Sequence, residues 1–264
     1  MRIRNLAILV ALLVAVPLGW GDNFWEKQPY TRWSRKDAQR LLEQSPWCQS
    51  ITLGSVAVDV SQRGRGGMNS GSLNVERAEA PKISYAVQLR SAPMVRRAVA
   101  RLSQIDNNYD QLGTEQKAAL DAKLSKYLSA TFPDSVVAYV TYSSNVQDYY
   151  TELRRYWRRQ DINLLKPTVF LNAGGEKLPL MGYVAGDNQF QFVFPRPANL
   201  PPEGSISVEF VHPNLDPKNT AEMAAAQTTR SGSGPTLATA VIGESRLRFE
   251  FKLKAMTVNG TPEF

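Results

Sequence analysis

His212 is the only histidine in this sequence of 264 residues, so it is the one imidazole able to act as a general base. It follows an alternating run over 205–211 that predicts a strand, and Asp216 comes soon after it in a predicted turn. A Ser-His-Asp set using Ser205 or Ser207 is therefore compatible with the composition. No Gly-x-Ser-x-Gly turn selects either serine as a nucleophile. His212 is a weak catalytic candidate, and a structural role at a strand end is the favoured interpretation.

Paired carboxylates are a second possible source of catalysis, because two acids that meet in a cleft leave no linear signature. The acidic residues that could form such a pair are scattered singly along the chain, among them Asp59, Glu76, Asp134, Asp187, Glu209 and Glu250. Alternation places Glu209 and Glu250 on the wet faces of their predicted strands, so we expect them to be solvated. A hydrolase acting on an envelope polymer, through two carboxylates or through His212, stays an alternative hypothesis.

Metal and cofactor sites are not predicted. One histidine excludes the HExxH zinc helix and most multi-histidine metal sites. The run Gly64–Gly67 follows a strand signal, but its spacing fits neither the Walker nor the dinucleotide pattern, and we expect a flexible loop there. Cys48 is the only cysteine, so no internal disulfide is possible, and its position beside Trp47 predicts a buried small hydrophobic residue.

Basic and aromatic residues are interleaved from Tyr149 to Arg159, a pattern that suits binding of anionic lipid, glycan or nucleic acid. At helical spacing the apolar members share one stripe: Tyr149, Tyr150, Leu153, Tyr156 and Trp157. The basic members occupy a different face: Arg154, Arg155, Arg158 and Arg159. We favour a buried aromatic stripe with a solvated arginine edge. The alternative is that these four arginines bind an anionic lipid or an acidic glycan.

The elements expected in residues 22–160 are helices with a few strands. Ser34, with Asp37 three residues later, predicts the start of a helix that Pro46 stops. A helix is also predicted from Pro93, and Val136–Tyr142 is apolar on both faces, as in a central strand. Further elements are strands near 51–60 and 83–90 and helices after Thr114 and Val146.

Residues 161–264 change to a strand pattern. Strands over 168–172 and 177–184 flank Ala173–Gly175 and predict a hairpin, with Pro179 at an edge or a bulge. Three alternating runs follow, over 190–194, 206–210 and 247–253. The fold class expected is therefore α+β, with a C-terminal antiparallel sandwich resembling an immunoglobulin domain. Because that domain would need seven strands, it stays open that the N-terminal strands belong to the same sheet system and form one domain.

The N-terminal segment has the sequence features of a secretory signal peptide. Arg2 and Arg4 precede an apolar run over Leu6–Leu18, and small residues then lead to a predicted cut after Gly21. A helix of thirteen residues, with a rise of about 1.5 Å per residue, is too short to cross a hydrocarbon core of about 30 Å. We therefore interpret residues 1–21 as a signal peptide that is removed. We expect export to the periplasm or secretion, which disfavours nucleic acid as a partner.

The formal net charge of the chain is +7. Residues 22–160 hold 20 basic and 14 acidic groups, whereas residues 161–264 hold 9 and 10. For an exported protein this asymmetry is compatible with an envelope protein, an acidic glycan or an anionic lipid as partner, beside its ordinary role in solubility.

Two separated stretches resemble a group of uncharacterised exported bacterial proteins. The opening stretch comprises Gln28–Ala38 and Ser45–Trp47, and the closing one comprises Phe194–Arg196, Val208–Pro213 and Arg246–Lys252. The resemblance implies export and a β-rich end, and it implies no activity. The favoured hypothesis is an exported, non-catalytic binding protein of the cell envelope or the secreted fraction, because catalytic groups are few.

Overall fold

The computed structural model describes residues 23–54, 82–198, 200–201, 203–215 and 245–264. Helices and antiparallel strands are mixed in this part of the chain, which confirms the α+β class. None of the described helices has the length and apolar character needed to cross a membrane. The predicted signal segment, the Gly64–Gly67 run and Asp216 lie outside the described residues.

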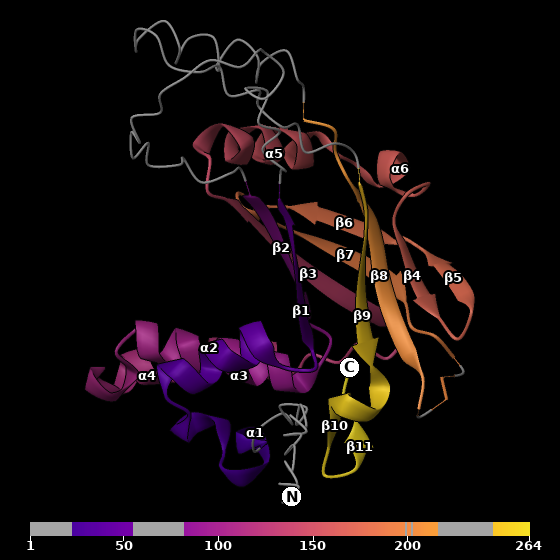
Figure 1. Cartoon of the computed structure of the whole chain (residues 1–264). Helices are drawn as coiled ribbons and strands as arrows, with labels where there is room; N and C mark the ends of the chain where they lie inside the picture. The colour runs from indigo at the N-terminus through magenta and orange to yellow at the C-terminus, as the bar shows by residue number, and fades with distance from the viewer. Residues whose placement is uncertain (1–22, 55–81, 199, 202, 216–244) are drawn as a thin grey trace, which may run out of the picture.

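The helical segments are, in chain order, α1 (Phe24–Lys27), η1 (Tyr30–Arg32), α2 (Arg35–Gln44), α3 (Pro93–Asp106), η3 (Tyr109–Gln111), α4 (Thr114–Ser129), α5 (Gln147–Arg159), α6 (Ile162–Leu165) and η4 (Leu253–Met256). The strands are β1 (Cys48–Gly54), β2 (Lys82–Leu89), β3 (Ser135–Ser144), β4 (Phe170–Ala173), β5 (Glu176–Pro179), β6 (Gly182–Ala185), β7 (Gln189–Pro195), β8 (Ser205–His212), β9 (Ser245–Lys252), β10 (Thr257–Val258) and β11 (Thr261–Pro262). In Figure 1, α5 crosses above one end of the strands, while α2, α3 and α4 lie together near the other end.

The helix starts follow from local capping. The Ser34 hydroxyl accepts a hydrogen bond from the Asp37 amide at 3.1 Å, and the Asp37 carboxylate accepts one from the Ser34 amide at 3.0 Å. This reciprocal box satisfies amide groups that the first turn of α2 leaves unpaired. Pro93 is the first residue of α3, where its missing N–H costs nothing. The helices predicted from Ser34, Pro93 and Thr114 are confirmed.

The strands form two main antiparallel sheets. The five-strand sheet has the order β1-β2-β3-β7-β6, and the four-strand sheet has the order β5-β4-β8-β9. β3 lies in the middle of the first, as its two apolar faces predicted. This sheet takes three strands from residues 22–160 and two from residues 161–264. A separate hairpin joins β10 to β11 through Asn259 and Gly260, whose φ angles are 49° and 78°.

The prediction of one strand over Lys177–Val184 is wrong. β5 ends at Pro179 on the edge of the four-strand sheet, and β6 begins at Gly182 on the edge of the five-strand sheet. The proline lacks a backbone donor and therefore suits an edge where pairing stops. The three alternating runs form β7, β8 and β9, which do not all lie in one sheet. β7 pairs with β3 and β6 in the five-strand sheet, whereas β8 pairs with β4 and β9 in the four-strand sheet.

The core lies between the two sheets and beneath α5. Tyr85 of β2, Phe190 of β7 and Phe210 of β8 all point into it and are fully buried. Trp157 of α5 stacks on Phe190 at 4.1 Å between ring centroids and meets Phe210 edge-on at 5.8 Å. The helix α5 therefore covers one end of the core that the two sheets enclose.

Candidate functional site

His212 lies inside the core rather than in a cleft. It is the last residue of β8 and is fully buried. Its Nδ1 lies 2.9 Å from the hydroxyl oxygen of Tyr85 on β2, and that oxygen also accepts a 3.4 Å hydrogen bond from Trp157 Nε1. A buried chain of three polar groups therefore links β8, β2 and α5.

The electrostatics of this chain keep the imidazole neutral. Burial lowers the pKa of His212 from 6.5 to about 4, because the charged imidazolium would lose its hydration. Burial also raises the pKa of Tyr85 above its usual range, since a buried phenolate is equally disfavoured. Both groups are therefore uncharged at neutral pH. With no exposed surface, His212 has no route to a proton on a dissolved substrate.

The register of β8 separates His212 from the two candidate serines. Successive strand residues point to opposite faces, so His212 shares the core face with Phe210, whereas Ser205 and Ser207 point to the outer face. A Ser-His pair from this strand cannot form hydrogen bonds across the sheet plane. The structure brings none of these serines to the imidazole.

Asp59 and Glu76 lie outside the described residues, and among the described carboxylates Asp121 is the one that lines the pocket beside α3 and α4. Glu209 is only 8% exposed, so the prediction of a solvated Glu209 is wrong. The side chains of Arg246 and Arg248 from β9 flank it at 3.8 and 3.7 Å, which shields it while balancing its charge. Glu250 is exposed, as predicted. Within the described ranges, no group of three or more His, Cys, Asp or Glu side chains lies close enough to hold a metal ion.

The four arginines of α5, here called the α5 edge, face away from the core as predicted. Tyr149, Leu153 and Trp157 of the aromatic stripe are buried, and Tyr150 and Tyr156 are half-buried. The basic side chains point outward: Arg155, Arg158 and Arg159 are exposed and Arg154 is half-exposed. Tertiary folding adds a carboxylate to this edge that the helix sequence does not show.

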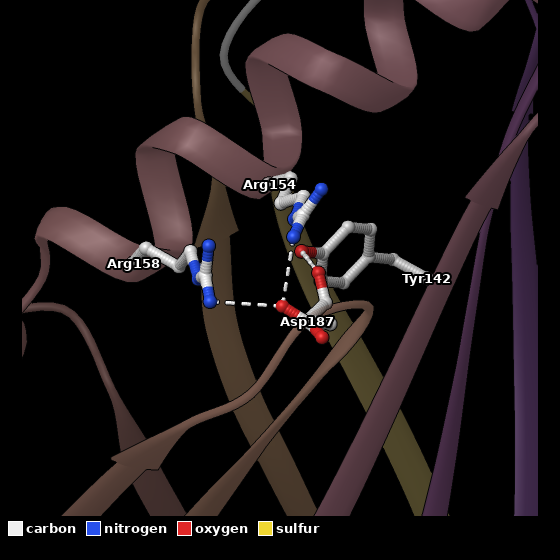
Figure 2. Close-up of polar contacts among 4 residues, drawn as sticks. All are labelled: Tyr142, Arg154, Arg158 and Asp187. Atoms are coloured by element: carbon white, nitrogen blue, oxygen red, sulfur yellow. Dashed lines mark hydrogen bonds and ion pairs between the residues drawn. The ribbon is translucent and has the colours of Figure 1, made fainter.

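That carboxylate is Asp187, in the turn between β6 and β7. Figure 2 shows its Oδ1 between Arg154 and Arg158, at 2.9 and 2.8 Å from an Nη2 atom of each guanidinium. The Tyr142 hydroxyl donates to the Asp187 backbone carbonyl at 3.0 Å, which fixes the turn. The hydrogen bond from Arg154, followed by the charges of Arg154 and Arg158, lowers the pKa of Asp187 below its usual range.

The pairing reduces the positive charge available to a partner. Asp187 neutralises part of Arg154 and Arg158, and Glu152 pairs with Arg155 one turn away. Among the described residues, no ion pair is formed by Arg159. The α5 edge is therefore a weaker anion-binding surface than four unpaired arginines on one helix would be.

A surface pocket lies between η1, α3 and α4, with a cavity volume of about 500 Å³. Arg97 and Asp121 place opposite charges on its wall, and Leu124 supplies an apolar surface. Arg97 also reaches Glu263 at 3.7 Å. The sequence did not reveal this pocket, because its walls come from three separate segments that meet only when the chain folds.

Cys48 is a buried free cysteine, as predicted. Burial raises the pKa of its thiol from 9.0 to about 12, an effect that a hydrogen bond with Ser45 only partly offsets. The thiolate needed for nucleophilic attack or disulfide exchange is therefore scarce at neutral pH.

Two partners that complete these sites had no recognisable signal in the sequence. Tyr85 lies on a strand far from His212 in the chain, and Asp187 was one of several scattered acidic residues with nothing in the sequence to link it to the arginines of α5. No family model matches this chain, and neither a curated protein nor a solved structure matches it.

Proposed function

We propose that this chain is an exported, non-catalytic binding protein of the cell envelope or the secreted fraction. The observation that carries the proposal is the full burial of His212, the only imidazole, beneath aromatic rings. The groups that solvent reaches are instead charged side chains and the pocket beside Arg97 and Asp121, which suit recognition. An immunoglobulin-like arrangement of residues 161–264 would fit such a module, and it stays a prediction.

The partner classes proposed are an envelope protein, an acidic glycan and an anionic lipid. Adhesion through the α5 edge is a second candidate, favoured by the outward orientation of Arg155, Arg158 and Arg159. It predicts binding to anionic vesicles or acidic glycan that weakens steeply with salt. The rival hydrolase is less favoured, because Asp121 is the one carboxylate among the residues that line the pocket beside α3 and α4.

Export is tested by sequencing the N-terminus of the protein recovered from the exported fraction. A mature chain that begins at Asp22 is expected. A full-length chain that stays in the membrane would contradict the predicted cut after Gly21.

Binding is tested by placing a photo-crosslinking amino acid at one of two sites in the native envelope. Ser125 lines the pocket, and Arg159 lies on the α5 edge. We expect one position to capture a defined molecule, and Glu176, exposed at a sheet edge, serves as the control position. In parallel, the purified chain should release no soluble fragments from isolated envelope polymer. Fragment release that His212→Phe abolishes in a folded variant would support the hydrolase instead.

A further inference from the structure

The pocket beside α3 and α4 lies along two antiparallel helices that pack side by side (Figure 1). Arg90, shortly before α3, donates a 3.3 Å hydrogen bond to the hydroxyl of Tyr127 near the end of α4. Tyr109, shortly after α3, donates one of 2.7 Å to the carboxylate of Asp121. The start of α3 therefore lies beside the end of α4.

The two charged side chains of the pocket belong to its opposite ends. Arg97 lies in the second turn of α3, and Gln104, seven residues later, lines the other end. Because α4 runs in the opposite direction, Asp121 is the lining residue of α4 that lies furthest towards the Gln104 end. At about 1.5 Å per residue, the two ends are roughly 10 Å apart along the helix axis.

Each of these charges keeps hydrogen-bonding capacity for a ligand. Arg97 and Glu263 form an ion pair at 3.7 Å, which is too long for a hydrogen bond. Within the described ranges the Arg97 guanidinium makes no hydrogen bond, and its side chain is 38% exposed. The Oδ2 atom of Asp121 accepts the bond from Tyr109, whereas Oδ1 has no hydrogen-bond partner among the same residues. Unused donors therefore lie at one end of the pocket and an unused acceptor at the other.

The rest of the wall is largely apolar and includes one buried amide. Pro93, Leu124 and Leu128 supply apolar surface. Gln104 is only 6% exposed, and its Oε1 accepts a 3.4 Å hydrogen bond from Arg101. Its Nε2 donates to no side chain or carbonyl in the part of the chain that the structure describes, so this donor is available to a ligand in the pocket.

We propose that the pocket binds a short peptide, about three residues long, with its free amino end at Asp121 and its free carboxyl end at Arg97. An extended chain spans at most about 3.3–3.6 Å per residue, so three residues match the roughly 10 Å between the charges. Both ends would make charge-assisted hydrogen bonds, and Gln104 can donate to a peptide carbonyl between them. The inference rests on the proposed function, in which this pocket is a recognition site.

An acidic glycan would fit this pocket less well. It supplies a carboxylate for Arg97 but no cation for Asp121, whose charge would repel it. The substitution Asp121→Asn therefore separates the two ligand classes by the sign of its effect. It should weaken the binding of a peptide with two free ends and strengthen the binding of an acidic glycan.

The test titrates the mature chain with alanyl-leucyl-alanine in a calorimeter. We expect a dissociation constant below about 1 mM. N-acetylation and C-amidation of the peptide should each weaken binding by about tenfold or more, because each removes one charge-assisted contact. Arg97→Gln and Asp121→Asn should weaken binding of the free peptide to a similar extent. The Asp121→Asn variant should also bind the free and acetylated peptides equally, since the partner of the amine is then gone.

Arg35 and Asp106 provide the matched control, because they form an exposed ion pair at 2.7 Å and do not line the pocket. Arg35→Gln and Asp106→Asn should change the affinity for the peptide by less than about twofold. A disaccharide of galacturonic acid serves as the acidic-glycan probe in the same titrations.

Three outcomes would overturn the proposal. They are no binding of the free peptide by the wild-type chain, equal binding of its free and acetylated forms, and binding of the disaccharide that Asp121→Asn strengthens. Photo-crosslinking from Ser125 to a different molecule would still support the binding function, so the two failures can be told apart.

Discussion

The hydroxyl of Tyr85 lies 2.9 Å from Nδ1 of His212, and the two residues come from different sheets. Tyr85 belongs to β2 of the five-strand sheet, and His212 ends β8 of the four-strand sheet. Because both side chains are fully buried, this hydrogen bond gives the interface between the sheets a defined polar contact. The imidazole therefore contributes to the packing of the two sheets.

Tyr85→Phe should destabilise the protein by about 1–3 kcal/mol, because it leaves Nδ1 of His212 buried without its partner. The free energy of unfolding in urea measures this loss. The same substitution in a His212→Phe background should cost less, since only Trp157 Nε1 then loses its hydrogen-bond partner. Equal losses in the two backgrounds would show that the hydrogen bond contributes nothing.

Stability should fall as the pH is lowered from about 6.5 to about 4. The pKa of His212 is about 4 in the folded state and 6.5 in an ordinary environment, so the unfolded chain takes up a proton first. The contribution is complete above pH 6.5, and about 3 kcal/mol is lost by pH 4. Urea denaturation across this range measures it. A matched series with His212→Phe should lack this part of the slope, and an unchanged slope would contradict the assignment.

Trp157→Ala should cost about 3–5 kcal/mol, because the indole fills the space between both sheets and stacks on Phe190 at 4.1 Å. Chemical denaturation of the soluble variant measures the loss. Leu164→Ala is a suitable control, since Leu164 is 60% exposed and should change stability by less than about 0.5 kcal/mol. Similar losses in the two variants would contradict the packing of α5 against the sheets.

Asp187→Ala should release Arg154 and Arg158 from their shared carboxylate with little change in melting temperature, because the ion pairs are exposed to solvent. The variant should bind anionic vesicles more strongly than the parent chain if the α5 edge is an adhesion surface. The gain should disappear as salt rises. Glu152→Ala is the matched control, since it frees Arg155 alone. No salt-sensitive binding by either variant would exclude adhesion through this edge.

Cys48 should react with a thiol reagent only when the chain opens. Its thiol is buried and its pKa is raised to about 12, so both access and thiolate are lacking in the folded state. The labelling rate at neutral pH should increase with urea as unfolding increases. Cys48→Ala gives the background signal, and rapid labelling without denaturant would contradict the burial of this residue.

The local elements of the fold were predictable because their causes are local. Ser34 and Asp37 cap α2 within four residues, and Pro93 begins α3 for reasons confined to its own backbone. The aromatic stripe through Leu153 and Trp157 likewise follows from helical spacing alone. Burial of Cys48 beside a large aromatic residue belongs to the same class of inference.

The sequence by itself determined the four longer helices, most strands of the two main sheets and the buried face of the alternating strands, because alternation and capping act between neighbours in the chain. Only the tertiary structure decided that β5 and β6 belong to different sheets and that Glu209 is shielded. It also brought Tyr85 to His212 and Asp187 to the α5 edge. These contacts join segments far apart in the chain. Their register depends on how complete surfaces pack, and alternation does not encode which surface will be the neighbour.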